Sequence, residues 1–357
     1  MKEEEKLQHE EEAVSKTEIL TRVKKHEIWI DYIKLFACIL VVTGHFFMSM
    51  KESGIITETK LYIWFTMTIY YFHVPLFFIC SGYLFQKYST IDSVKSWTRN
   101  VIKKAVSLGI PYVVFSTVTW LLKSVFSGSV NGGVQSNLLY TILVEPISPY
   151  WYLYCLFCIF LITPTFQSKK TMWIAISVAL VMKVLYIYEL TLGIHAIYYV
   201  FGNEIWFLAG MALGKTRFGE ENFKYSKFRV AMISAVFIGM SIYITVRNVW
   251  FVGREFFMGT LACAAVVEAF AIFTKRKESG KVSTFLIKST LPIYLLHTIA
   301  AACFRVVLIK LGIYHVGIHV VGGLFASFAG PMIFMLLMGK IKVMEFLIYP
   351  QKYIQIK

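Results

Sequence analysis

The sequence has too little charge for a soluble globular protein. Asp, Glu, Lys and Arg make up only 16% of its 357 residues, whereas 57% are hydrophobic. Soluble domains usually contain about 25% charged residues. The apolar runs that separate the charges therefore indicate a polytopic membrane protein.

The cysteines lack the pattern of a disulfide-stapled secreted domain, because all six lie inside apolar segments. They are Cys38, Cys80, Cys155, Cys158, Cys263 and Cys303. The CLFC stretch from Cys155 to Cys158 has the spacing of a metal or redox pair, but neither a second CxxC nor a nearby His follows it. We expect packing residues here and no metal site.

Other functional classes are excluded by what is missing. Residues 1–28 are mixed in charge and have no apolar core, so they are not a cleavable signal peptide. The stretch GGLFASFAG, residues 322–330, lacks the lysine of a P-loop and indicates helix packing. The net charge of +15 is spread over short clusters between apolar runs, so we expect no nucleic-acid partner.

Ten segments are long enough to cross a bilayer, which takes about 20 largely apolar residues. They are 29–50, 61–86, 104–126, 150–167, 171–189, 197–214, 230–247, 255–274, 290–310 and 317–340. The sequence therefore predicts an all-α transmembrane bundle. One membrane domain, residues 29–340, lies between an N-terminal tail, 1–28, and a C-terminal tail, 341–357.

The distribution of Lys and Arg predicts the orientation of this bundle, because these residues favour cytoplasmic loops. Basic clusters follow every even-numbered span, at 87–104, 169–170, 215–229 and 275–288. The alternate connections hold few cations. Both termini are therefore predicted to be cytoplasmic.

Three ionisable residues share one face of the first span. Lys34 and His45 are 11 positions apart, close to three helical turns, and Asp31 precedes Lys34 by three residues. A polar stripe on a spanning helix normally faces a cavity or a neighbouring helix. The alternative for Asp31 and Lys34 is an interfacial ion pair, with Lys34 reaching the headgroups.

The second span carries a histidine and a proline near mid-membrane. Pro75 cannot donate to the carbonyl of Tyr71, so we expect the helix to be kinked or loosened beside His73. Ser81 and Gly82 offer a small-residue surface to another helix. Further along the chain, Glu204 and Arg305 are candidates to line a cavity or to pair with each other, whereas Lys183 and Glu268 are expected to reach the interfaces.

Four motifs, taken together, resemble the acyltransferase 3 family of integral membrane acyltransferases. In chain order they are DYIKLFACILVVTGH (31–45), FHVPLFFICSGYLF (72–85), YWYLYCLF (150–157) and LPIYLLHT (291–298). The resemblance covers essentially the whole ten-span region. Within the family, the chain is most similar to fucose 4-O-acetylase-like members that O-acetylate sugar hydroxyls on bacterial surface polysaccharides.

The resemblance implies that the cation and the histidine of the first span, Lys34 and His45, belong to an active site. The family often has Arg at the first position, and Lys binds phosphate as a point charge rather than with a planar fork. The remaining motif residues, His73, Ser81, Trp151 and His297, are implied substrate-binding candidates, to which we add the intramembrane charges Glu204 and Arg305.

The implied activity is transfer of acetyl from acetyl-CoA to a glycan hydroxyl, in the cytoplasmic membrane of a bacterium and without a tightly bound cofactor. Imidazole, with an ordinary pKa near 6.5, suits the removal of a hydroxyl proton. We expect His45 to be the general base or an acyl relay, Lys34 to hold the donor, and Asp31 to position Lys34.

Two alternatives to this activity stay open at this point. One is a transporter or sensor that uses the intramembrane histidines and charges. The other is the unrelated family of membrane-bound O-acyltransferases, which the histidine in the first span disfavours. The sequence also leaves open whether copies of the chain form a homo-oligomer.

Overall fold

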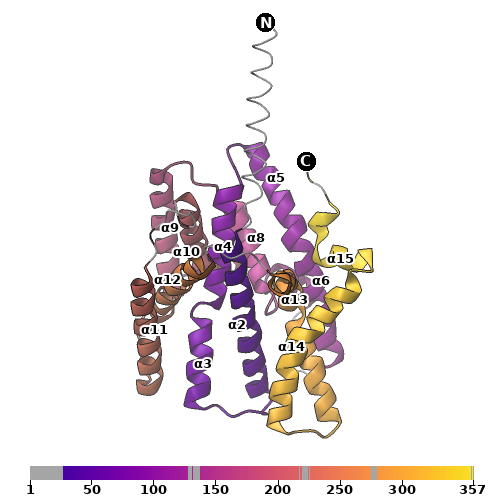
Figure 1. Ribbon diagram of the computed structural model, residues 1–357. Coiled ribbons are helices and arrows are strands. Elements are labelled where there is room, and N and C mark those ends of the chain that lie inside the picture. The colour runs from indigo at the N-terminus through magenta and orange to yellow at the C-terminus, as the bar shows by residue number, and fades with distance from the viewer. Residues whose placement is uncertain are drawn as a thin grey trace.

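The computed structural model describes residues 27–127, 131, 137–216, 218, 224, 226–274, 280–354 and 356, and every regular element among them is a helix (Figure 1). The helices are α2 (Ile28–Glu52), α3 (Lys60–Tyr70), α4 (His73–Tyr88), α5 (Val94–Lys104), α6 (Ile110–Val125), α7 (Leu138–Leu143), α8 (Trp151–Ile162), α9 (Lys169–Ile187), α10 (His195–Lys215), α11 (Lys227–Arg247), α12 (Arg254–Thr274), α13 (Lys281–Lys310), α14 (Val316–Met338) and α15 (Lys342–Ile348). The predicted all-α fold is confirmed. Most of the predicted N-terminal tail, residues 1–26, lies outside the described residues.

Nine helical segments of the described chain are long and apolar enough to span a membrane. The predicted fourth span, 150–167, is instead the 12-residue helix α8. It rises about 18 Å, whereas the hydrocarbon core is about 30 Å thick. The helix stops early because Thr163 precedes Pro164 and adopts an extended conformation.

The predicted second span is divided into two helices. α3 ends at Tyr70 and α4 begins at His73, with Tyr71 and Phe72 between them. Pro75 occupies the first turn of α4, where its missing N–H costs no helical hydrogen bond. The sequence correctly predicts a weak point, and the structure places a complete break directly before His73.

Glycine allows α4 and α10 to pack backbone against backbone. A side-chain carbon added at Gly82 would lie 1.9 Å from the carbonyl oxygen of Phe207, and one added at Gly210 would lie 2.0 Å from that of Ile79. No larger residue fits at either position. The small-residue surface expected at Gly82 is therefore confirmed, and it anchors α4 on α10.

The GGLFASFAG stretch also packs closely, as expected. A carbon added at Gly322 would lie 2.5 Å from the ring of Phe304 on α13, and one added at Gly323 would lie 2.6 Å from the ring of Phe46 on α2. The stretch therefore holds α14 against α13 and α2.

Pro292 interrupts the hydrogen bonding of α13, the longest helix described. Its missing N–H leaves the carbonyl of Lys288 without the usual partner four residues on. The hydroxyl of Tyr349, which follows α15, donates to that carbonyl at 3.0 Å. The segment after the last span is thus connected to α13.

We predict that a cysteine at position 53 is labelled by an impermeant reagent from outside the cell, whereas a cysteine at position 95 is labelled only from the cytoplasm. α3 and the connection from α13 to α14 lie at one end of the bundle, opposite α5 (Figure 1). The basic residues near α5 oppose export. Outside labelling at position 95 would reverse the orientation. The predicted outer site Gly133 and the inner site Lys277 lie outside the described residues.

Candidate active site

A cavity of about 1010 Å³ opens among the central helices. Four of the predicted site residues line it: His45, His73, Trp151 and Arg305. The described lining does not include the other five, which are Asp31, Lys34, Ser81, Glu204 and His297. The sequence prediction therefore identifies the cavity but extends beyond it.

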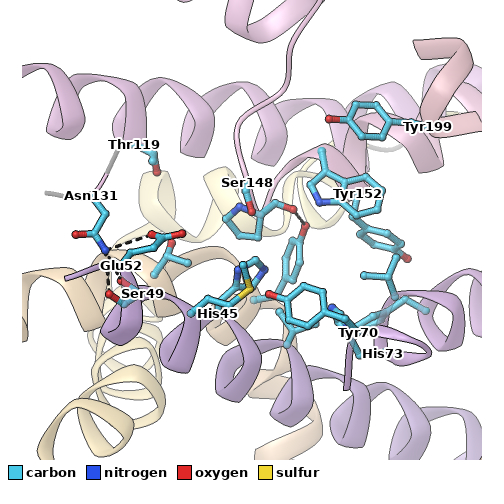
Figure 2. Close-up of a pocket in the computed structure, with 18 of the residues that line it drawn as sticks. His45, Ser49, Glu52, Tyr70, His73, Thr119, Asn131, Ser148, Tyr152 and Tyr199 are labelled. Carbon is cyan, nitrogen blue, oxygen red and sulfur yellow. Dashed lines mark hydrogen bonds between the residues drawn. The ribbon is translucent and has the colours of Figure 1, made fainter. Parts of the chain in front are cut away.

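Three helices bring histidines together at the cavity. The ring of His45 on α2 lies 5.5 Å from the ring of His297 on α13 and 6.2 Å from the ring of Tyr70 on α3, between centroids. The ring of Tyr70 in turn lies 4.6 Å from that of His73 on α4. Figure 2 shows His45, Tyr70 and His73 side by side. His45 and His73 are thus connected through an aromatic ring.

The backbone fixes the protonation of two of these rings. Nδ1 of His73 lies 2.8 Å from the carbonyl oxygen of Ile69, and Nδ1 of His297 lies 2.9 Å from that of Tyr294. A carbonyl oxygen only accepts hydrogen bonds, so each Nδ1 carries a hydrogen. The lone pair of each neutral ring is therefore on Nε2. Nε2 of His297 is buried and has no hydrogen-bond partner among the described residues.

Two of the motifs noted in the sequence bind each other directly. The hydroxyl of Tyr150 donates to the carbonyl of Leu295 at 2.8 Å, and the hydroxyl of Tyr294 donates to the carbonyl of Pro149 at 2.5 Å. These bonds join the start of α8 to the part of α13 that carries His297. Tyr150 and Tyr294 therefore have a structural role in these two motifs, because each hydroxyl binds the backbone of the other segment.

Polar side chains gather at one end of the cavity. Arg305 donates to the carbonyl oxygen of Ser49 at 3.1 Å and also to its hydroxyl. The amide of Asn131 donates to the same carbonyl at 2.9 Å and to the carboxylate of Glu52 at 3.3 Å. In Figure 2 this group lies on one side of His45, with Tyr152 and Tyr199 on the other.

The suggested pairing of Glu204 with Arg305 is wrong. Glu204 is buried and accepts a hydrogen bond from the hydroxyl of Thr163 at 2.8 Å. Arg305 binds Ser49 on α2 instead. Because α10 carries Glu204 toward α8 and α13 carries Arg305 toward α2, the two side chains have separate partners.

The opposite end of the cavity is aromatic and contains an unexpected cation. The rings of Trp151 and Tyr199 are stacked, with centroids 5.0 Å apart and planes 18° apart. Lys183 lines the cavity there, so the expectation that it reaches an interface is wrong. The signal in the sequence was a lysine in the interior of an apolar span.

Glu268 is itself buried and meets the surface only through its partner. Its carboxylate pairs with the guanidinium of Arg229, whose side chain is 51% exposed. It also accepts a hydrogen bond of 2.8 Å from the backbone N–H of Ser226. This pair joins α12 to the start of α11, and neither residue belongs to the described lining of the cavity.

The remaining predicted residues lie around the cavity rather than in it. The hydroxyl of Ser81 is 3.2 Å from that of Tyr152, which lines the cavity. Lys34 lies close enough to Lys104 for the two positive charges to interact. The ammonium of Lys104 sits 4.1 Å from the ring centroid of Phe160. The role expected for Asp31 stays a prediction.

A family model described as an acyltransferase domain matches residues 27–336. Two curated relatives are both named nodulation protein NolL. The one from Mesorhizobium japonicum is 28% identical over 150 residues, 42% of this chain and 38% of its own length. The one from Sinorhizobium fredii is 32% identical over 160 residues, 44% of this chain and 41% of its own length. The chain therefore spans about two fifths of these relatives, and no solved structure matches it.

Proposed function

Because the chain belongs to the acyltransferase 3 family, we propose that it transfers an acetyl group from acetyl-CoA to a sugar hydroxyl of a cell-surface or extracellular polysaccharide. The observation that carries this proposal is the position of His45. Its ring faces a large cavity and lies 5.5 Å from a second histidine whose lone pair is unpartnered. Such a pair suits the removal and return of a proton.

The reaction needs one base and one leaving group. The imidazole of His45 takes the proton of the sugar hydroxyl while the hydroxyl oxygen forms a bond to the acetyl carbon. The tetrahedral intermediate then breaks its carbon–sulfur bond, and the proton passes from the imidazolium to the departing thiolate of CoA. Atoms and charge balance without a metal or a redox partner.

His73 and His297 assist in different ways. The centroids of the His45 and His297 rings are 5.5 Å apart. A small movement of either ring would let an N–H of His45 donate to Nε2 of His297, and this hydrogen bond would orient the base. His73 begins α4, and the first N–H groups of a helix have no acceptor within that helix. The positive end of α4 therefore faces the cavity where the oxyanion of the intermediate would develop.

The donor site is proposed on the predicted cytoplasmic side. Lys34 and Lys104 carry like charges that interact, and together they offer two cations to an anionic ligand. The phosphates of acetyl-CoA would supply such an anion. This proximity supports the role of Lys34 that the family resemblance implies.

We predict that Lys34→Met raises the KM for acetyl-CoA at least tenfold, because a lost phosphate contact of about 1.4 kcal/mol corresponds to a factor of 10. Lys34→Arg should keep most of the activity, since it keeps the charge. Initial rates against acetyl-CoA concentration, normalised to folded protein, measure the effect. Lys95→Met, on the exposed surface of α5, is the control. An unchanged KM for Lys34→Met would remove Lys34 from the donor site.

The proposed activity is tested on purified protein in lipid nanodiscs. Acetyl-CoA labelled in its acetyl group is mixed with bacterial polysaccharide that has been chemically de-O-acetylated. We expect release of free CoA together with transfer of the label to alkali-labile esters on the glycan. Boiled protein and polysaccharide-free reactions are the controls. If no polysaccharide accepts the label and no CoA is released, the proposed function is wrong.

A further inference from the structure

We propose that the wall of the cavity built from α8, α9 and α10 seats a neutral sugar ring, and that Lys183 is the hydrogen-bond donor that fixes it. This inference rests on the proposed function and names the part of the cavity that binds the acceptor. The juxtaposition that carries it is a buried ammonium beside a stacked aromatic pair in one cavity.

Lys183 has donor capacity to spare. Its ammonium donates to the carbonyl of Gly202 at 2.7 Å, and an ammonium has three N–H groups. The carbonyl of Gly202 lies inside α10, where the helix already provides a donor four residues later. Satisfying this carbonyl therefore does not require Lys183, and two further N–H groups are available to other acceptors.

Gly202 makes room for this arrangement. A side-chain carbon at position 202 would lie 2.9 Å from the ring of Tyr186, so only glycine lets that ring approach α10. The ammonium of Lys183 lies 4.4 Å from the centroid of the same ring. The hydroxyl of Tyr186 is 3.2 Å from that of Tyr198, which also lines the cavity. Gly202, Lys183 and the two tyrosines therefore form one connected part of the cavity wall.

The aromatic pair supplies the second element of a sugar site. Trp151 and Tyr199 both line the cavity and stack with planes 18° apart. A pyranose presents C–H groups on its faces and hydroxyls at its edge. An aromatic surface with a few polar groups at its border matches this division.

The charges of this wall favour a neutral ligand. Glu255, in the first turn of α12, also lines the cavity and interacts electrostatically with Lys183. The two charges offset each other, and together they offer both donors and acceptors, as sugar hydroxyls require. A sugar acid would add a negative charge that this balanced pair leaves uncompensated, and an uncompensated charge is costly to bury.

The test measures binding directly, without acetyl transfer. Saturation-transfer NMR is recorded on protein in nanodiscs with methyl glycosides of galactose, glucose and mannose, and with methyl glucuronide. We expect at least one neutral glycoside to receive saturation from the wild type and from His45→Ala. The signal should fall at least fivefold in Lys183→Met and in Trp151→Ala. Methyl glucuronide should give less signal than the matching neutral glucoside.

Controls separate binding from folding. Lys170→Met carries the same substitution at an exposed position of α9 and should bind like the wild type. Lys183→Gln keeps a donor and should retain part of the signal, and thermal unfolding confirms that each variant is folded. Unchanged binding in folded Lys183→Met, a preference for the glucuronide, or no binding to the wild type would each overturn the inference. Binding without any CoA release would support this site while rejecting the proposed function.

Discussion

Replacing His45 by alanine is expected to lower acetyl transfer by 10²- to 10⁴-fold, the range that removal of a general acid–base group typically gives. The protein should insert and fold normally, because the half-buried ring of His45 faces the cavity and not the packed core. His73→Ala should be milder if this ring only orients or stabilises. The measurement is the initial rate of CoA release and glycan acetylation at saturating acetyl-CoA.

His315→Ala is the matched control for this experiment. His315 is exposed at the start of α14, outside the described lining of the cavity, and its loss should leave the rate unchanged. Near-normal acetylation by a folded His45→Ala variant would end the assignment of His45 as the base. A radiolabel retained on acid-quenched wild type but not on this variant would instead identify His45 as a covalent relay.

Substituting Gly82 or Gly210 by valine is expected to abolish the folded protein. Even the first added carbon would lie 1.9 Å or 2.0 Å from a backbone oxygen of the opposing helix, which no rotamer change relieves. Overpacking typically costs about 1–3 kcal/mol, and here the backbones of α4 and α10 must also separate. Size-exclusion chromatography in detergent and thermal unfolding should detect aggregation or loss of the monodisperse peak.

Gly239→Val is the control for these substitutions. Gly239 lies on α11, and a carbon added there meets nothing within 4 Å. The variant should elute and unfold like the wild type. A normal melting curve for Gly82→Val would show that α4 and α10 do not depend on the close contact.

The sequence predicted most helices because apolar length is a local property. The bounds of α10, predicted as 197–214, are His195–Lys215 in the structure. The sequence also predicted that His45 faces a cavity, because a histidine deep in an apolar span is costly unless it lies in a cavity or has a partner. Both inferences need only one segment at a time.

Properties that depend on two segments could not be predicted. The end of α8 is an exception, because its signal is local: Pro164 ends the helix after 12 residues, although the apolar run continues for the length of a span. The pairing of Glu204 with Arg305 failed because helix rotation decides which neighbour a side chain meets. The interfacial position expected for Lys183 was wrong for the same reason. Only the packing of α9 on α10 shows that its ammonium turns inward.

The volume of the cavity also determines how the chain can enter the membrane. About 1010 Å³ holds on the order of 30 water molecules at liquid density. Lys183 faces this space, whereas on an isolated helix in lipid it would oppose insertion by about 2.5–3.5 kcal/mol at the bilayer centre. α10 supplies the carbonyl that binds Lys183 and lines the cavity beside it. During biogenesis, α9 should therefore leave the translocation channel together with α10, as a helical hairpin.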